Sequence, residues 1–277
     1  MTPRTLTHRV RGLPTHDGAG VRLTRLIGQP ALEMLDPFLL LDAFGSDRGS
    51  DYIAGFPDHP HRGFETVTYM LAGRMRHRDN HGNGGLLEAG GAQWMTAGRG
   101  LVHSEMPEQT EGEMRGFQLW VNLPAAHKMM PPRYQDIAPT QIPEVEPAPG
   151  TRVRVVAGEA FGAQGPVQGI LTAPLFVDIA LAQDARLALA LPAAHAAFAY
   201  VFEGDGLALG DGLLARGELG VLGAGDTVAL AAPQGAARLI LAAAAPLHEP
   251  VARWGPFVMN TPQQIEQALS DYRAGRL

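Results

Sequence analysis

Glycine and proline recur throughout this chain and limit what it can fold into. Its 277 residues include 34 glycines and 22 prolines, about one in every five positions. Breakers at this frequency argue against long helices and favour short strands joined by turns. Between them lie short apolar runs such as TVTYMLAG, GFQLWVNL, TRVRVVAG, APLFVDIAL and AFAYVFEG. The pattern predicts an all-β fold, either an antiparallel sandwich or a barrel.

One proline-rich segment separates two halves of the chain. PTQIPEVEPAPG, residues 139–150, has little apolar content and no periodicity. We interpret it as the linker between an N-terminal domain, residues 1–138, and a C-terminal domain, residues 151–277.

The tail NTPQQIEQALSDYRAGRL departs from the strand pattern. Thr261 can cap a helix, Pro262 can occupy its first position, and Gln264 can complete a capping box. We therefore expect one short C-terminal helix over 262–273.

The two halves contain a weak internal repeat. GLLEAGGAQWMTAGRG, from Gly85, aligns with GLLARGELGVLGAGDT, from Gly212, at an offset of 127 residues. TYMLAG aligns with AYVFEG at an offset of 131, which matches Tyr69 with Tyr200. The shared order of strand, glycine turn and strand predicts two copies of one β-unit.

Composition excludes several function classes. The chain has no cysteine, so a bound metal must be held by nitrogen and oxygen ligands. A net charge of −6 gives no reason to expect nucleic acid or an anionic membrane as a partner. The sequence has no apolar run long enough to span a membrane, no phosphate-binding loop, no dinucleotide fingerprint and no nucleophile elbow. The N-terminus lacks the apolar segment of a signal peptide, and we expect a cytoplasmic protein.

Two pairs of metal-ligating residue types share one spacing. His59 and His61 lie two residues apart, and so do His103 and Glu105. On a strand, residues two apart point to the same face. Two adjacent strands could therefore bring three imidazoles and one carboxylate to one point, a set that suits a first-row divalent metal. Glu65 is separated from His59 and His61 by an even number of residues and would lie on the same strand face. It is therefore the alternative to Glu105 as the fourth metal ligand.

A single pair of this kind is a weak signal, whereas two pairs in one half of a cysteine-free β-protein are a stronger one. We interpret His77 and His81, in a charged and glycine-rich segment, as parts of a solvated turn.

The repeat allows the candidate ligand positions of the first half to be compared with the second half, where none of the matching residues can bind a metal. The positions that correspond to His59, His61, Glu65, His103 and Glu105 hold Ala190, Pro192, Ala196, Leu230 and Ala232.

Long motifs in the chain resemble those of the pirin family of the cupin superfamily. They are LDPFLLLDAF, GFPDHPHRGFETVTYMLAG, QWMTAGRGLVHSEMP, GFQLWVNLP and GPFVMNTPQQIEQA. The resemblance implies a bicupin, in which two double-stranded β-helix barrels face each other and a short helix follows. It also implies a metal, most often iron, held by His59, His61, His103 and Glu105, and a second barrel without metal. Nickel, manganese, cobalt or zinc would accept the same ligands.

The same resemblance suggests two functions. Several pirins are similar to flavonol 2,3-dioxygenases, for which quercetin is the usual substrate. Such an enzyme would bind the flavonol through its 3-hydroxyl at Fe(II), use Glu105 as the general base, and release carbon monoxide. The alternative is a non-enzymatic, iron-dependent redox sensor that binds a protein partner. A pocket between the barrels wide enough for a three-ring aromatic would favour the enzyme, and a sealed metal would favour the sensor.

Overall fold

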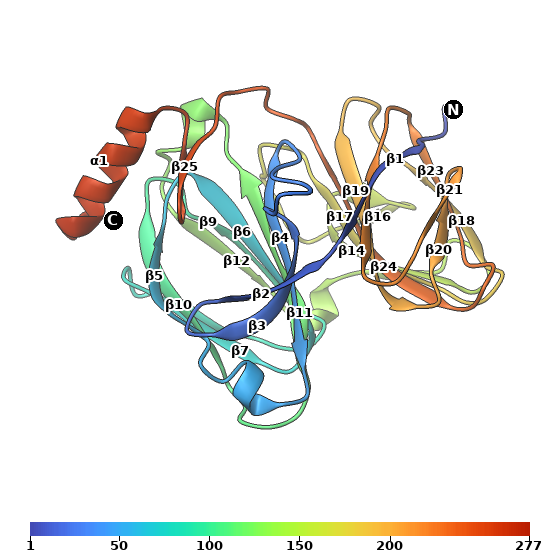
Figure 1. The fold of residues 1–277 in the computed structure, drawn as a ribbon, viewed down its shortest axis with the longest axis horizontal. Coiled ribbons are helices and arrows are strands. Elements are labelled where there is room, and N and C mark those ends of the chain that lie inside the picture. Colours follow the sequence, from blue (N-terminus) through green and yellow to red (C-terminus); the bar gives the residue numbers. More distant parts are fainter. The chain divides into compact units, whose positions relative to one another are not determined.

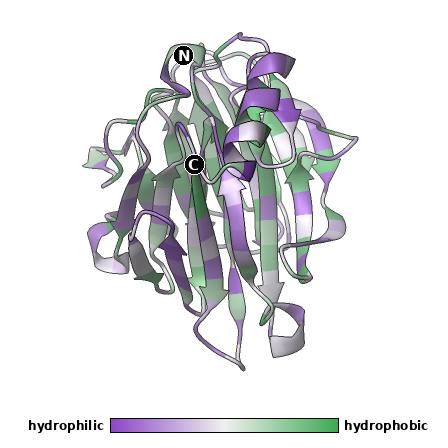
Figure 2. Cartoon of the chain, turned by 90° about the vertical axis from the view of Figure 1, so that its left-hand side faces the viewer, coloured by the Kyte–Doolittle hydropathy of each residue, from purple (hydrophilic) through white to green (hydrophobic).

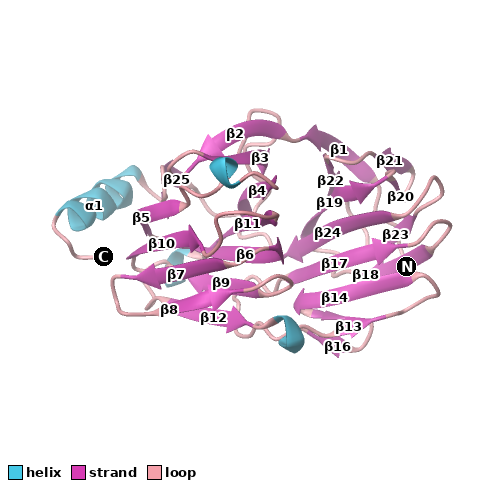
Figure 3. Ribbon diagram, turned by 90° about the horizontal axis from the view of Figure 1, so that it is seen from below, coloured by secondary structure: helices cyan, strands magenta, loops and turns pink.

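The computed structural model describes residues 1–277 and divides into two compact units. The larger unit comprises residues 13–139 and 247–277, and the smaller unit comprises residues 1–12 and 140–246. Strands are the main regular secondary structure of both units, and the one α-helix is α1 (Pro262–Arg273) (Figure 3).

The larger unit contains two antiparallel sheets. Its seven-stranded sheet has the order β12 (Arg133–Ile137), β9 (Ala92–Thr96), β6 (Phe64–Ala72), β11 (Met114–Asn122), β4 (Phe38–Ser46), β3 (Val21–Ile27) and β2 (Leu13–Asp17). Its four-stranded sheet has the order β5 (Phe56–His61), β10 (Leu101–Pro107), β7 (Met75–Asp79) and β8 (Gly84–Leu87). The remaining elements are the ribbon β25 (Ala252–Trp254) and β26 (Phe257–Met259), and the short helices η1 (Gly49–Asp51) and η2 (Ala125–His127). Residues from both sheets, among them Phe44, Met70 and Met75, share one buried cluster.

The smaller unit also contains two antiparallel sheets. The seven-stranded sheet has the order β1 (Leu6–Arg11), β22 (Glu218–Leu222), β19 (Ala196–Gly204), β24 (Ala237–Ala244), β17 (Leu175–Leu181), β14 (Thr151–Ala157) and β13 (Glu144–Val145). The four-stranded sheet has the order β18 (Arg186–Ala190), β23 (Thr227–Ala231), β20 (Leu207–Leu209) and β21 (Gly212–Leu214). The remaining elements are the ribbon β15 (Glu159–Ala160) and β16 (Ala163–Gln164), and η3 (Pro139–Gln141).

The strand orders confirm the internal repeat. The run β9-β6-β11-β4 corresponds to β22-β19-β24-β17, and the sheet β5-β10-β7-β8 corresponds to β18-β23-β20-β21. The predicted pair of all-β barrels is therefore present. In the smaller unit, β18 and β23 contribute Leu187, Leu189, Val228 and Leu230 to a continuous apolar core. Burial of leucine and valine side chains stabilises that unit through the hydrophobic effect.

The division of the chain differs from the sequence-based one at both ends. β1 pairs with β22, and Val10 is buried against Leu219, so the first residues belong to the smaller unit rather than to domain 1–138. The C-terminal residues belong to the larger unit, because α1 packs on β25 and β26 (Figure 1). The segment 139–150 is not wholly irregular, since it contains β13, which pairs with β14.

The terminal helix begins and ends as the sequence predicts. The Thr261 hydroxyl accepts from the Gln264 backbone N–H, the Gln264 side chain accepts from the Thr261 N–H, and Pro262 follows the cap. Most of α1 is hydrophilic (Figure 2), and it buries Ile265 and Ala268 against the ribbon β25–β26. No helix in the structure has the length and apolar character needed to cross a bilayer.

Candidate metal centre

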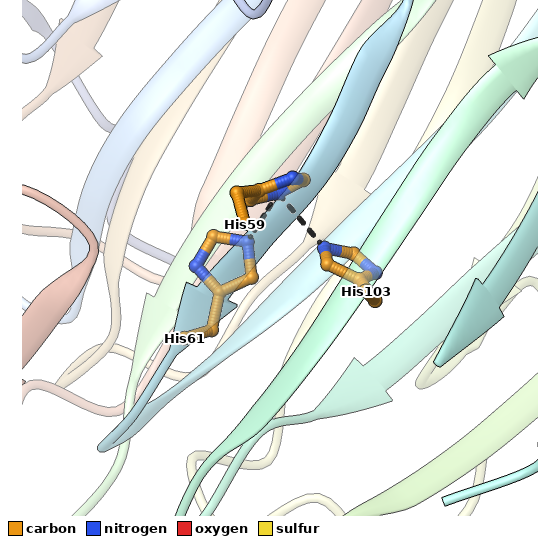
Figure 4. A group of neighbouring side chains, drawn as sticks. All are labelled: His59, His61 and His103. Atoms are coloured by element: carbon orange, nitrogen blue, oxygen red, sulfur yellow. Dashed lines mark hydrogen bonds between the residues drawn. The ribbon is translucent and has the colours of Figure 1, made fainter. Parts of the chain in front are cut away.

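Three of the four predicted ligands converge on one point of the larger unit. His59 and His61 lie on β5 and His103 lies on β10, and the antiparallel register of these strands sets His103 opposite His59. The Nε2 atom of His59 is 3.0 Å from Nε2 of His61 and 3.0 Å from Nε2 of His103 (Figure 4). The ligand atoms of the three imidazoles all lie within 4.8 Å of one another.

The protonation of these rings suits metal binding. His59 Nδ1 donates to the Pro57 carbonyl at 2.8 Å, which leaves a lone pair on Nε2 of the neutral ring. Burial, and then the neighbouring imidazoles, hold the pKa of His61 well below its ordinary value. Burial and the charges of His59 and His77 do the same to the pKa of His103. The rings of His61 and His103 are therefore neutral at pH 7, the form that ligates a metal.

Glu105 lies in the same pocket but outside this group of three. Its Oε1 is 2.9 Å from the Thr68 hydroxyl, and its Oε2 accepts from Gln118 Nε2 at 3.1 Å. The Thr68 hydroxyl is also 2.6 Å from Gln118 Oε1, so its single proton has two acceptors. The register of β10 against β5 shifts between His103 and Glu105, a bulge that spacing alone does not predict.

Glu65 is held away from the pocket. Its Oε1 accepts from the Thr96 hydroxyl at 2.6 Å, and the residue is 2% exposed. Burial raises the pKa of Glu65 to about 7. Glu105 lines the pocket with His59 and His61, whereas Glu65 does not.

A cavity of about 570 Å³ opens beside the histidines, and every residue that lines it belongs to the larger unit. Pockets of this size hold small organic ligands. Its apolar wall consists of Leu23, Leu40, Phe44, Phe56, Met75 and Trp120. The rings of His61 and Trp120 meet edge to face, with centroids 5.3 Å apart, so the wall also fixes one ligand.

The interpretation of His77 as part of a solvated turn is wrong. His77 lies on β7, is 1% exposed, stacks on Tyr134 and bonds Asp136 at 3.0 Å. It faces Glu105 across the β7–β10 pair. The alternation of burial along Met75–Asp79 is the period-two signal of a strand, and it was hidden by three charged residues.

The C-terminal segment supports the ligand strand. The Arg62 backbone N–H donates to the Pro256 carbonyl at 3.3 Å, and the Val258 N–H donates to the Arg62 carbonyl at 3.0 Å. The Arg62 side chain also pairs with Asp271 of α1 at 2.8 Å. Arg253 and Pro256 line the cavity. Local patterns in the sequence do not predict this contact between distant segments.

A buried lysine ties three segments together near the cluster. Lys128, the only lysine of the chain, is 1% exposed. Its Nζ donates to the Gly63 carbonyl at 2.7 Å, to Asn122 Oδ1 at 2.6 Å and to the Val258 carbonyl at 2.9 Å. Burial lowers the pKa of Lys128 to about 7, and the charge of Glu249 opposes that shift in part.

The donor set fits a first-row divalent metal. Three imidazole nitrogens converge on one spot, and the Glu105 carboxylate lines the same cavity as His59 and His61. Nitrogen and oxygen ligands of this kind suit iron, nickel, manganese, cobalt or zinc, and they leave coordination positions for a small molecule.

Comparisons with known proteins agree with this arrangement. The family model described as Pirin matches residues 20–121, and the model described as the Pirin C-terminal cupin domain matches residues 176–277. A Pseudomonas aeruginosa protein, named provisionally as a quercetin 2,3-dioxygenase, is 52% identical over 96% of this chain and 95% of its own length. A pirin-like protein of Caulobacter vibrioides is 49% identical over the full length of both chains. The crystal structure of a quercetin 2,3-dioxygenase from Acinetobacter baumannii superposes with a TM-score of 0.91 at 31% identity, covering 99% of this chain and 98% of that chain.

Proposed function

Because this chain belongs to the pirin family of cupin proteins, whose members bind a metal through a histidine cluster, we propose that it is a metal-dependent flavonol 2,3-dioxygenase. Its substrates are flavonols such as quercetin, together with dioxygen, and one product is carbon monoxide. The observation that carries the proposal is the convergence of three imidazole Nε2 atoms beside an apolar-walled cavity. The names of the related proteins from Pseudomonas aeruginosa and Acinetobacter baumannii support the choice of reaction.

His59, His61, His103 and Glu105 would hold the metal, and Fe(II) is the ion we assign. When bound, it would supply a Lewis acid that lowers the pKa of a flavonol 3-hydroxyl and a redox-active centre for dioxygen. The protein holds the His61 imidazole in a fixed orientation, because the rings of Phe64 and Trp120, which contact each other, both meet it edge to face. The apolar wall of the cavity excludes water from the flat face of the substrate.

Glu105 accepts the substrate proton, and its neighbours hold that proton in place. When Glu105 Oε1 is protonated, it can donate a hydrogen bond to the Thr68 hydroxyl oxygen. The Thr68 hydroxyl then donates its own hydrogen bond to Gln118 Oε1. Gln118 Nε2 donates back to Glu105 Oε2 and closes the ring. Thr68 and Gln118 therefore fix the orientation of the Glu105 carboxyl group for the base step.

Thr68→Val should lower kcat while leaving the bound metal in place. The substitution keeps the shape of the side chain and removes the hydroxyl that links Glu105 to Gln118. We expect a loss of about 10- to 100-fold, the usual effect of removing a hydrogen-bond partner of a metal-site residue. Oxygen consumption with quercetin and elemental analysis of the same sample measure the two quantities.

Thr96→Val is the matched control. Thr96 is as buried as Thr68 and also donates to a glutamate, Glu65, which does not line the cavity. We expect its kcat to stay within about twofold of the wild type. Equal losses in the two variants would show that the Thr68 hydroxyl has no specific part in proton transfer.

The proposed activity is tested on protein purified without a histidine tag. The protein is loaded with Fe(II) without oxygen, its metal content is measured, and oxygen uptake and carbon monoxide are followed after quercetin is added. We expect one metal per chain and uptake that requires both metal and flavonol. Loaded protein that consumes no oxygen with any flavonol between about pH 6 and pH 9 would contradict the proposal.

The regulatory alternative is less well supported. A redox sensor that needs no substrate is expected to seal its metal with side chains. Here a cavity of about 570 Å³ reaches His59 and His61, which favours an enzyme with a small-molecule substrate.

A further inference from the structure

Six residues with a carboxylate or guanidinium group line the cavity, and three of them compensate one another's charges. They are Asp17, Arg25, Asp42, Asp58, Glu105 and Arg253. Arg25 donates to both carboxylate oxygens of Asp42, at 2.9 and 2.7 Å, and to Asp17 at 2.9 Å. Asp42 is 3% exposed, so this pairing offsets the cost of burying its charge. These three residues have little remaining capacity to bind a charged ligand.

Arg253 differs because it has no carboxylate partner. Its Nη1 donates to the Leu39 carbonyl at 3.3 Å and its Nε to the Gly255 carbonyl at 3.4 Å, both long bonds to neutral acceptors. Its Nη2 makes no hydrogen bond within the protein. Asp42 and Asp17 interact with Arg253 only through longer-range electrostatics, and both carboxylates are ion-paired with Arg25. Arg253 is exposed overall, and partial burial of its guanidinium, followed by the nearby charge of Arg25, lowers its pKa.

The position of Arg253 suits contact with a flat ligand. Its guanidinium lies over the Trp120 ring, with the central carbon 5.0 Å from the ring centroid, and Trp120 in turn meets His61. Stacking on an aromatic ring orients the planar guanidinium of an arginine. Because Nε and Nη1 of Arg253 already donate to backbone carbonyls, Nη2 is the nitrogen left to bind a ligand. Asp58 and Glu105 are the other lining residues without a cationic partner. Asp58 precedes His59 on β5, so its side chain points to the face of that strand opposite to His59.

We propose that Arg253 forms a second binding point of the cavity, which takes a carboxylate or phenolate group on the part of the substrate remote from the metal. This inference rests on the proposed function, because it assigns the end of the flavonol that the histidine cluster does not hold. It makes Arg253 a specificity-determining residue: the enzyme prefers aromatic enols that carry an acidic substituent over neutral ones. A charge-assisted hydrogen bond from the guanidinium supplies that preference.

The test measures binding rather than turnover. The protein is loaded with Zn²⁺, which accepts the same ligands and does not react with dioxygen. Fluorescence titrations compare 3-hydroxyflavone-7-carboxylate and 3-hydroxyflavone-4′-carboxylate, each against its own neutral methyl ester. In the wild type we expect the acid of at least one pair to bind about tenfold tighter than its ester, or more.

Two substitutions at one position separate charge from packing. Arg253→Met keeps an apolar stem over Trp120 and should reduce the acid-to-ester ratio to about one, while Arg253→Lys should keep part of it. Arg273→Met removes a positive charge from exposed helix α1 of the same unit and should leave the ratio unchanged.

The outcomes distinguish this inference from the function on which it rests. Equal binding of acids and esters by the wild type, or an unchanged ratio in Arg253→Met, would show that Arg253 only covers Trp120 and would overturn the inference alone. Binding of none of the four probes by zinc-loaded protein would contradict both the inference and the proposed function.

Discussion

His61→Ala is expected to abolish metal binding and, with it, all flavonol-dependent oxygen uptake. His61 contributes one of three converging Nε2 atoms, and no other imidazole lies in the group that could replace it. Removing an outer partner of a metal ligand already costs 10- to 100-fold in affinity, so loss of a ligand should exceed about 100-fold. Competition between the protein and a chelator, followed by elemental analysis, measures the change.

The control for this prediction is His195→Ala. His195 is a histidine of the smaller unit and does not line the cavity. Its substitution should leave metal content and activity unaltered. The smaller unit of His61→Ala should stay folded, as followed by circular dichroism, because its leucine-rich core contains no part of the site. A folded His61→Ala protein that retained a full equivalent of metal would show that the cluster is not the binding site.

Lys128→Met should destabilise the larger unit by about 3–5 kcal/mol. Methionine fills a similar volume but leaves the carbonyls of Gly63 and Val258 and the Asn122 amide oxygen without a donor. Each buried acceptor that loses its partner costs about 1–3 kcal/mol. Arginine cannot restore the contacts, because its planar fork does not match three acceptors around one point. Urea unfolding followed by circular dichroism measures the free energy of unfolding of Lys128→Met and Lys128→Arg.

The stability deficit of Lys128→Met should grow as the pH rises above 7. The pKa of Lys128 is about 7 in the folded protein and about 10.5 in the unfolded chain, so in this window the unfolded chain binds more protons. Wild-type stability therefore rises with pH between about 7 and 10.5, and the variant lacks this gain. A deficit that narrowed on going from pH 7 to pH 9 would contradict the assignment.

The pKa itself can be measured without mutation. Lys128 is the only lysine, so lysine labelled with ¹⁵N gives a single side-chain ammonium signal. Three short contacts favour the ammonium form, since a neutral amine has only two N–H donors, but burial disfavours the charge more strongly. We therefore expect the signal to titrate below the ordinary value of about 10.4 for a solvated lysine.

The sequence predicted the features that depend on local periodicity. The capping box of Thr261 and Gln264 places the terminal helix, because a cap acts within one turn. The two-residue spacing of His59 and His61 set them on one face of a strand, since that alternation is a property of the backbone. The repeat between the halves appeared as equivalent strand orders in the two units.

Features that depend on distant contacts were not predictable in this way. The first strand pairs with β22 and the terminal helix packs in the larger unit, so neither terminus follows the division at 139–150. The bulge between His103 and Glu105 changes the register without leaving a mark in the spacing. His77 and Arg253 gain their surroundings from Asp136 and Trp120, residues far away in the chain.

The coordination of the bound metal tests the central claim most directly. X-ray absorption spectroscopy of Fe(II)-loaded protein reports the number of imidazoles around the metal. We predict three imidazole ligands with an oxygen ligand in the wild type, and two imidazoles or no bound metal in His61→Ala. A spectrum with fewer than two imidazoles, or one that is identical in His61→Ala, would mean that the metal binds elsewhere.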